Sequence, residues 1–145
     1  MKHLYWNDIK EGSIIPRKEK YLTLMEFNRF AAANDEFYMY HMDPEYAKKL
    51  GWPEVIIMGH LRMAYMSKLV EDWVGIDGQI KKIGCQHRGV DVRNSTIYVG
   101  GKVINKYEEN GQLLLDCELW VDNEKGERTS PGWATVELLY KKESK

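Results

Sequence analysis

The spacing of the apolar residues changes at Gly75, and this change limits the folds that the chain can adopt. From His60 to Val74 apolar residues recur every three or four positions around most of the circumference, which predicts a long helix at the centre of the fold. Beyond Gly75 apolar and polar residues alternate, most clearly over 112–122, which predicts strands with one buried face. Such a sheet needs a cover for its apolar face, and the helix is the available cover.

Glycine-containing turns divide the alternating half into strands. The segments 108–111 (EENG) and 123–127 (NEKGE) are typical of hairpin turns with glycine in a left-handed position. Hairpin connections make neighbouring strands antiparallel, so we expect a four-stranded antiparallel meander, in an α+β fold. The expected strands lie near 79–90, 95–107, 112–122 and 127–140.

Two capping signals predict shorter helices in the first half. Thr23, with Glu26 three residues later, matches a capping box and begins a helix that ends near Ala33. Asp43 is a second N-cap candidate, and Pro44 follows it in the first helical position that proline favours. The first half is therefore mixed and helical.

The remaining segments of the first half are expected to be irregular. A short strand is expected at 13–15, because Pro16 and the charged residues 17–20 favour an edge or a loop. The segment 34–40, between the two expected helices, is predicted to be a loop.

Length and composition fit one globular domain over residues 1–145. Of the 145 residues 43% are hydrophobic and 30% charged, which is enough for a core. The 21 Lys and Arg against 22 Asp and Glu argue against a nucleic-acid partner. No apolar run approaches the roughly 20 residues of a membrane span, and the N-terminus has no apolar signal-peptide core.

Cysteine usage favours a reducing compartment. Cys85 and Cys117 lie far apart in segments expected to be strands, and neither belongs to a CxxC metal motif. We therefore expect reduced thiols in a cytoplasmic protein, and no metal or redox cofactor.

The candidate site lies between Asp35 and Gly59. His41 stands just before the second expected helix, six positions after Asp35 and five after Glu36. An imidazole and a carboxylate on one loop can share a water molecule, with one group taking a proton and the other donating one, as in adding water to an activated double bond. A solvated acidic loop with an incidental histidine is the alternative interpretation.

Gly59 stands at the start of the long helix. The first N–H groups of a helix lack internal partners and carry the positive end of its dipole, and a glycine lets a carbonyl oxygen approach closely. An oxyanion site for an enolate is one interpretation. A glycine required only by sterics or by a turn is the other.

The stretch 29–47, RFAAANDEFYMYHMDPEYA, resembles a motif of the MaoC-like hydratases and dehydratases of the hotdog superfamily. The family pattern reads roughly R-Y-A-x-x-S-G-D-x-N-P-x-H-x-D-x-x-x-A, followed by a glycine and an apolar run that ends in H-G. The resemblance covers most of the chain. The residues that match are Arg29, Ala31, His41, Asp43, Ala47, Gly51 and Gly59.

The resemblance implies a hotdog fold, in which a long central helix is wrapped by a curved antiparallel β-sheet. It implies a lyase of fatty acid metabolism that hydrates 2-enoyl-CoA with R specificity or dehydrates 3-hydroxyacyl-CoA or 3-hydroxyacyl-ACP. The acyl thioester would be the substrate, without a cofactor. The implied partner is a second hotdog chain, in a homodimer or a heterodimer.

Residue by residue, the resemblance implies that His41 is the catalytic histidine and that Gly59 donates its N–H to the thioester carbonyl. Glu36 stands where the family has aspartate, and Asp35 falls on the preceding glycine, so Glu36 is the preferred partner of His41 and Asp35 the second choice. The family's histidine before this glycine is missing here, and His60 follows the glycine instead, as a substrate-binding candidate.

Two further substrate-binding candidates and two further functions remain. Tyr38 could line an acyl pocket or pack in the core, and Arg88 could approach the ligand mouth or belong to a solvated strand face. The altered acid and Asn-Pro positions favour, as an alternative, a non-catalytic acyl-CoA-binding subunit of a heterodimer. An acyl-CoA thioesterase is the third hypothesis, because the same superfamily includes this activity.

Overall fold

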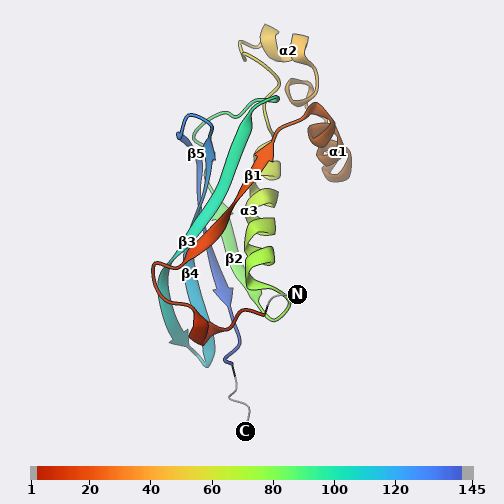
Figure 1. The fold of residues 1–145 in the computed structure, drawn as a ribbon. Coiled ribbons are helices and arrows are strands. Elements are labelled where there is room, and N and C mark those ends of the chain that lie inside the picture. Colours follow the sequence, from red (N-terminus) through yellow and green to blue (C-terminus); the bar gives the residue numbers. More distant parts are fainter. Residues whose placement is uncertain (1–2, 142–145) are drawn as a thin grey trace.

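The long helix α3 (Gly59–Val74) lies along one face of a curved antiparallel sheet, and the helices α1 (Leu24–Asn34) and α2 (Pro44–Lys49) stand beyond one end of both (Figure 1). The structure is a computed structural model that describes residues 3–141. Its five strands form one sheet in the order β1-β3-β4-β5-β2. The elements in chain order are η1 (Trp6–Asp8), β1 (Ile14–Tyr21), α1 (Leu24–Asn34), η2 (Met39–His41), α2 (Pro44–Lys49), α3 (Gly59–Val74), β2 (Gln79–Cys85), β3 (Thr96–Glu109), β4 (Gln112–Asn123) and β5 (Arg128–Glu137).

Both predicted helix caps are present. The Thr23 hydroxyl accepts a hydrogen bond from the Glu26 N–H at 3.2 Å, and α1 begins at the next residue. The Asp43 carboxylate accepts a hydrogen bond from the Glu45 N–H at 2.8 Å, and Pro44 occupies the first turn of α2. These side chains satisfy N–H groups that have no partner inside the helix, and they fix where the two helices begin.

The sheet order corrects the expected meander. β3, β4 and β5 are consecutive antiparallel neighbours as predicted, but β2 pairs with the far side of β5, where Ile83 lies opposite Ala134. β1 adds a fifth strand at the other edge, and it is longer than the predicted 13–15 because it continues through Pro16. An edge strand tolerates proline since one of its sides needs no ladder partner.

The segment 86–95, which joins β2 to β3, crosses the end of the sheet instead of forming a hairpin. We call it the crossover. The crossover pairs with the chain just before α3, where the Ile57 N–H donates to the Asp91 carbonyl at 2.9 Å and Ile56 bridges to Val92. Residues that were predicted to extend the first strand to position 90 therefore lie against the N-terminal end of α3.

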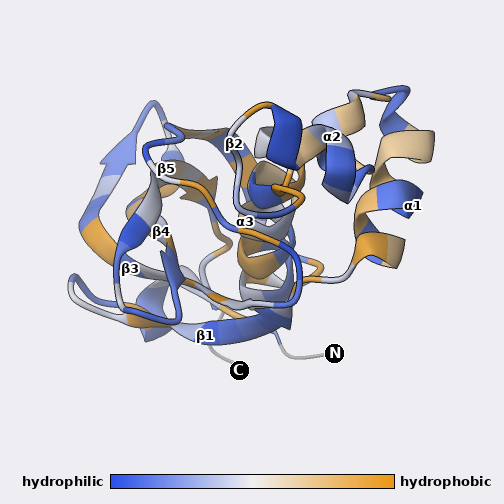
Figure 2. Cartoon of the chain, turned by 90° about the horizontal axis from the view of Figure 1, so that it is seen from above, coloured by the Kyte–Doolittle hydropathy of each residue, from blue (hydrophilic) through white to orange (hydrophobic). Residues whose placement is uncertain are grey.

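The core lies between α3 and the sheet. Its fully buried side chains come from α3, from the inner face of the strands, from the segment before α3 and from α1, which contributes Phe27. Figure 2 shows apolar and polar colours alternating along the strands and a mostly hydrophilic edge strand β1. Cys117 is buried in this core and Cys85 is half-buried, and both are free thiols. No helix in 3–141 is long and apolar enough to cross a membrane.

We expect truncation of Leu115 to alanine to lower the free energy of unfolding by about 2–5 kcal/mol, because it leaves a cavity in the core. The matched control is Leu50→Ala at a leucine that is 54% exposed, where a change of about 0.5 kcal/mol or less is expected. Urea denaturation measures both. Equal losses at the two positions would contradict the assigned core.

Candidate active site

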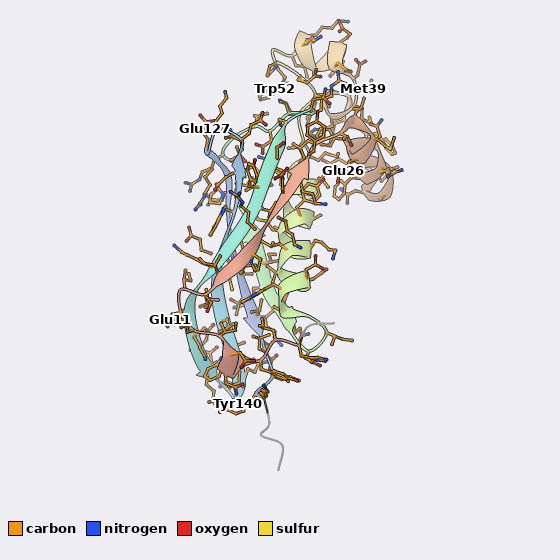
Figure 3. All side chains as sticks on the ribbon, in the orientation of Figure 1. Glu11, Glu26, Met39, Trp52, Glu127 and Tyr140 are labelled. Carbon is orange, nitrogen blue, oxygen red and sulfur yellow. The ribbon has the colours of Figure 1, made fainter. Side chains whose placement is uncertain are left out.

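A cavity of about 340 Å³ opens at the N-terminal end of α3, below the end of the molecule where Met39 and Trp52 are labelled (Figure 3). Three parts of the chain contribute its walls: the segment between α1 and α2, the segment 56–62 at the start of α3, and the crossover. The lining residues are Glu36, Tyr40, His41, Ile56, Ile57, Gly59, His60, Arg62 and His87. The structure thus gathers four sequence-predicted residues and adds a wall that the sequence analysis did not include.

His41 is buried, with 5% of its surface exposed, at the end of the short turn η2. Its Nδ1 lies 2.7 Å from the Ile56 carbonyl oxygen, and since a carbonyl can only accept, Nδ1 carries the proton. Burial lowers the pKa of His41, the Ile56 hydrogen bond and Glu36 oppose this shift, and the Arg62 charge adds to it. A neutral ring with a free Nε2 results, which is the form that acts as a base.

Glu36 faces the same cavity, and its side chain is only 15% exposed. Its Oε2 accepts a hydrogen bond from the Asn34 amide at 3.0 Å and lies 3.1 Å from the His60 Nδ1. Within the described residues no hydrogen bond joins Glu36 to His41; the carboxylate acts on the imidazole only through space. The carboxylate is thus held at the wall of the cavity by His60.

Gly59 is the first residue of α3, and Met58 before it supplies no side-chain cap. The N–H groups of this first turn have no partners inside the helix. A Cβ placed on Gly59 would lie 2.7 Å from the Nε2 of His87, closer than two such atoms approach. Only glycine therefore fits at this position while His87 keeps its place.

A buried ion pair that the sequence analysis missed supports the cavity. Arg62 donates to the Asp91 carboxylate at 3.2 Å and to the Gly89 carbonyl at 2.8 Å, and the Thr129 hydroxyl donates to the same Asp91 oxygen at 2.8 Å. Burial raises the pKa of Asp91, and Thr129 and Arg62 oppose that shift. The sequence contained one indication that Arg62 is buried: it stands four positions before the core residue Met66 and so shares the inward face of the helix.

The remaining predicted site residues lie outside this cavity. Asp35 follows α1 in the left-handed conformation with φ +54° and lines an adjoining cavity together with Tyr38. The Arg88 guanidinium is exposed and donates to the Gln86 side-chain oxygen at 2.6 Å. Within residues 3–141 no group of three or more His, Cys, Asp or Glu side chains is arranged to hold a metal ion.

Solved structures with the same architecture are hotdog proteins. R-hydratase PhaJ1 from Pseudomonas aeruginosa superposes with a TM-score of 0.87 at 16% identity, over 99% of this chain and 93% of that one. The (R)-hydratase of A. caviae involved in PHA biosynthesis gives 0.83 at 19%, over 90% and 97%. The ChsH1-ChsH2 complex from Mycobacterium tuberculosis gives 0.80 at 19%, over 89% and 98%. At these identities the likeness establishes the fold.

The fold is accordingly a hotdog, in the α+β class, as the resemblance implied. The family model described as MaoC like domain matches residues 9–110. The chain therefore belongs to the MaoC-like family. No curated protein sequence gives a significant match to it.

We expect Gly59→Ala to lower the free energy of unfolding by about 0.5–1.5 kcal/mol, because the new Cβ forces the exposed His87 ring out of its preferred rotamer. The change should cost much less in a His87→Ala background, where the obstacle is gone. A double-mutant cycle in urea measures this coupling. The same cost in both backgrounds would show that His87 does not set the requirement for glycine.

Histidine-ring NMR should show His41 titrating below pH 6.5, the ordinary value for histidine, because burial disfavours its charged form. A folded-state pKa below the unfolded one means that the unfolded chain binds more protons. The His41 contribution to stability is therefore fully present above about pH 6.5 and is lost as the pH falls. A His41 midpoint at or above 6.5 would contradict the buried, neutral ring.

Proposed function

We propose that the chain is a hydratase or dehydratase for acyl thioesters, which adds water to a 2-enoyl-CoA or removes it from a 3-hydroxyacyl-CoA or 3-hydroxyacyl-ACP. The observation that carries the proposal is the buried His41, whose Nδ1–H is used by the Ile56 carbonyl, so that Nε2 is the free base in a cavity shared with Glu36 and Gly59. Membership of the MaoC-like family supports a hydratase-type enzyme.

In the hydration direction, His41 Nε2 takes a proton from water as the water oxygen bonds to C3 of the enoyl group. The electron pair of the C2–C3 double bond moves toward the thioester oxygen, where the Gly59 N–H stabilises the enolate. Glu36 orients the water by accepting its second O–H, and the protonated His41 returns its proton to C2. One water is consumed, and the histidine ends neutral as it began.

We further propose that the active form pairs two hotdog units, as a homodimer or with a different hotdog chain. The Mycobacterium tuberculosis structure of similar fold, which is the ChsH1-ChsH2 complex, supports this proposal. The two free cysteines favour a reducing, cytoplasmic setting.

A second candidate function is a non-catalytic acyl-CoA-binding subunit of a heterodimer. The observation that favours it concerns Glu36. Its side chain is longer than the family aspartate, and its carboxylate pairs with His60 instead of His41. The activity assay below decides between the two.

Loss of enoyl absorbance with short and medium 2-enoyl-CoA substrates tests the leading proposal. We expect the wild type to hydrate at least one of them, and His41→Ala and Glu36→Gln each to lose about 10²–10⁴-fold in kcat, since each removes one proton-handling group. His3→Ala is the matched control, because His3 pairs with Asp77 outside the cavity.

Asp35→Asn separates the two acids, since asparagine also tolerates the left-handed conformation there. A loss in Asp35→Asn with none in Glu36→Gln would transfer the carboxylate role to Asp35. Full activity in His41→Ala would exclude the proposed mechanism. No hydration at any chain length would favour the non-catalytic subunit, and release of free CoA thiol would identify a thioesterase.

A further inference from the structure

His87 lies on the crossover, far in sequence from the motif, yet it lines the same cavity as His41 and Gly59. We propose that His87 is a second hydrogen-bond donor to the thioester carbonyl oxygen, from Nε2–H, alongside the Gly59 N–H. This inference rests on the proposed function, because it assigns a further catalytic residue to the same reaction. Three observations carry it: the closeness of the two donors, the tautomer of the ring, and the fixed position of the crossover.

The two donors lie close enough to share one oxygen. The His87 Nε2 is 2.7 Å from the position of a Cβ on Gly59. A backbone nitrogen stands about 2.5 Å from the Cβ of its own residue, so the Gly59 N and the His87 Nε2 are at most about 5.2 Å apart. An oxygen that accepts two hydrogen bonds of ordinary length spans donors up to about 5.8 Å apart. A carbonyl oxygen in the cavity can therefore accept from both groups.

The surroundings of His87 favour the tautomer with the proton on Nε2. Its Nδ1 lies 3.2 Å from the hydroxyl of Ser130, which is fully buried. A buried hydroxyl hydrogen needs an acceptor, and Nδ1 is the partner that the described structure gives to this hydroxyl. Nδ1 then accepts, so Nε2 carries the proton. Within residues 3–141 the one hydrogen-bond partner of Nε2 is the Cys85 sulfur at 3.8 Å, and a ligand oxygen can replace this long, weak bond.

The proposed role requires a neutral ring, because Nδ1 accepts a hydrogen bond and so carries no proton. The surroundings of His87 favour this neutral form. Burial lowers the pKa of His87, and the nearby charge of Arg62 lowers it further. A neutral imidazole donates one hydrogen bond without adding a full charge to the cavity. This hydrogen bond strengthens during the reaction because negative charge develops on the thioester oxygen.

The backbone on both sides of His87 is anchored, which fixes the point from which its side chain extends. The N–H groups of Arg88 and Gly89 both donate to the Thr129 carbonyl, at 2.9 and 3.0 Å, and the Gln86 N–H donates to the Pro131 carbonyl at 2.9 Å. Donors on a rigid backbone cost little reorganisation when the charge forms.

The first test is kinetic and uses the enoyl-CoA substrate that the wild type hydrates best. Loss of one oxyanion donor typically lowers kcat about 10²–10³-fold, so His87→Leu should fall by that amount with a smaller change in KM. His87→Gln, whose side-chain amide can donate from a similar distance, should recover at least about tenfold of the loss. Gln86→Leu is the matched control at the neighbouring exposed residue, which does not line the cavity, and it should keep wild-type kcat.

The second test does not depend on turnover. In the His41→Ala background, carbonyl-labelled crotonyl-CoA stays intact, and the infrared stretch of its bound thioester carbonyl reports hydrogen bonding directly. We expect this stretch to lie below its value for free crotonyl-CoA, to move back toward that value on adding His87→Leu, and to stay low on adding His87→Gln.

The outcomes separate the inference from the function on which it rests. An unchanged kcat in His87→Leu, or a lowered kcat with an unchanged carbonyl stretch, would overturn the role of His87 and leave the hydratase proposal intact. A wild type that hydrates nothing, with a carbonyl stretch that still depends on His87, would overturn the hydratase proposal and support the donor. A carbonyl stretch equal to that of free crotonyl-CoA would overturn both.

Discussion

The buried pair of Arg62 and Asp91 is the interaction on which the arrangement of the cavity depends. Arg62 comes from the first turns of α3, Asp91 from the crossover, and Thr129, from β5, donates to the same carboxylate oxygen. Removing one partner of such a pair leaves a buried charge uncompensated and typically costs about 3–5 kcal/mol. Burial lowers the pKa of both His41 and His87, and the positive charge of Arg62 adds a smaller contribution in the same direction. Arg62 therefore both holds the crossover through Asp91 and influences the pKa of the two cavity histidines.

The parts of the fold that could be predicted from the sequence are those whose signals are local. Thr23 and Asp43 cap helices because their own side chains reach N–H groups two or three residues away. The β3–β4–β5 hairpins follow from short turns. The partner of β2 could not be predicted in this way, because pairing between β2 and β5 joins segments about fifty residues apart in sequence. The expected hairpin from β2 to β3 was wrong for that reason, and β1 was missed beyond residue 15 because an edge strand accommodates Pro16 and charged side chains.

The residues of the candidate site likewise fall into those that local sequence predicts and those that only the tertiary structure brings in. One local motif could identify four site residues together, because they lie within a short stretch of sequence: Glu36, His41, Gly59 and His60. In the structure these four residues line the same cavity. His87, Asp91 and Thr129 reach it only through the crossover and the sheet order, and nothing in their local sequence marks them. Gly59 illustrates the limit of the local argument. The sequence suggested a glycine that admits a substrate carbonyl, whereas the structure shows that its hydrogen is also what admits the ring of His87.

Two departures from the family pattern turn out to be joined in space. Glu36 is one methylene longer than the aspartate that the pattern places there, which moves the carboxylate by roughly 1.5 Å. The histidine next to the glycine follows it here, as His60, instead of preceding it. In the folded chain these two residues meet, with the Glu36 oxygen 3.1 Å from the His60 ring nitrogen. The two departures are therefore coupled: the longer Glu36 side chain reaches the His60 ring, and His60 supplies a hydrogen-bond partner for the Glu36 carboxylate. Together with the Asn34 amide, His60 holds the Glu36 carboxylate at the wall of the cavity that His41 also faces.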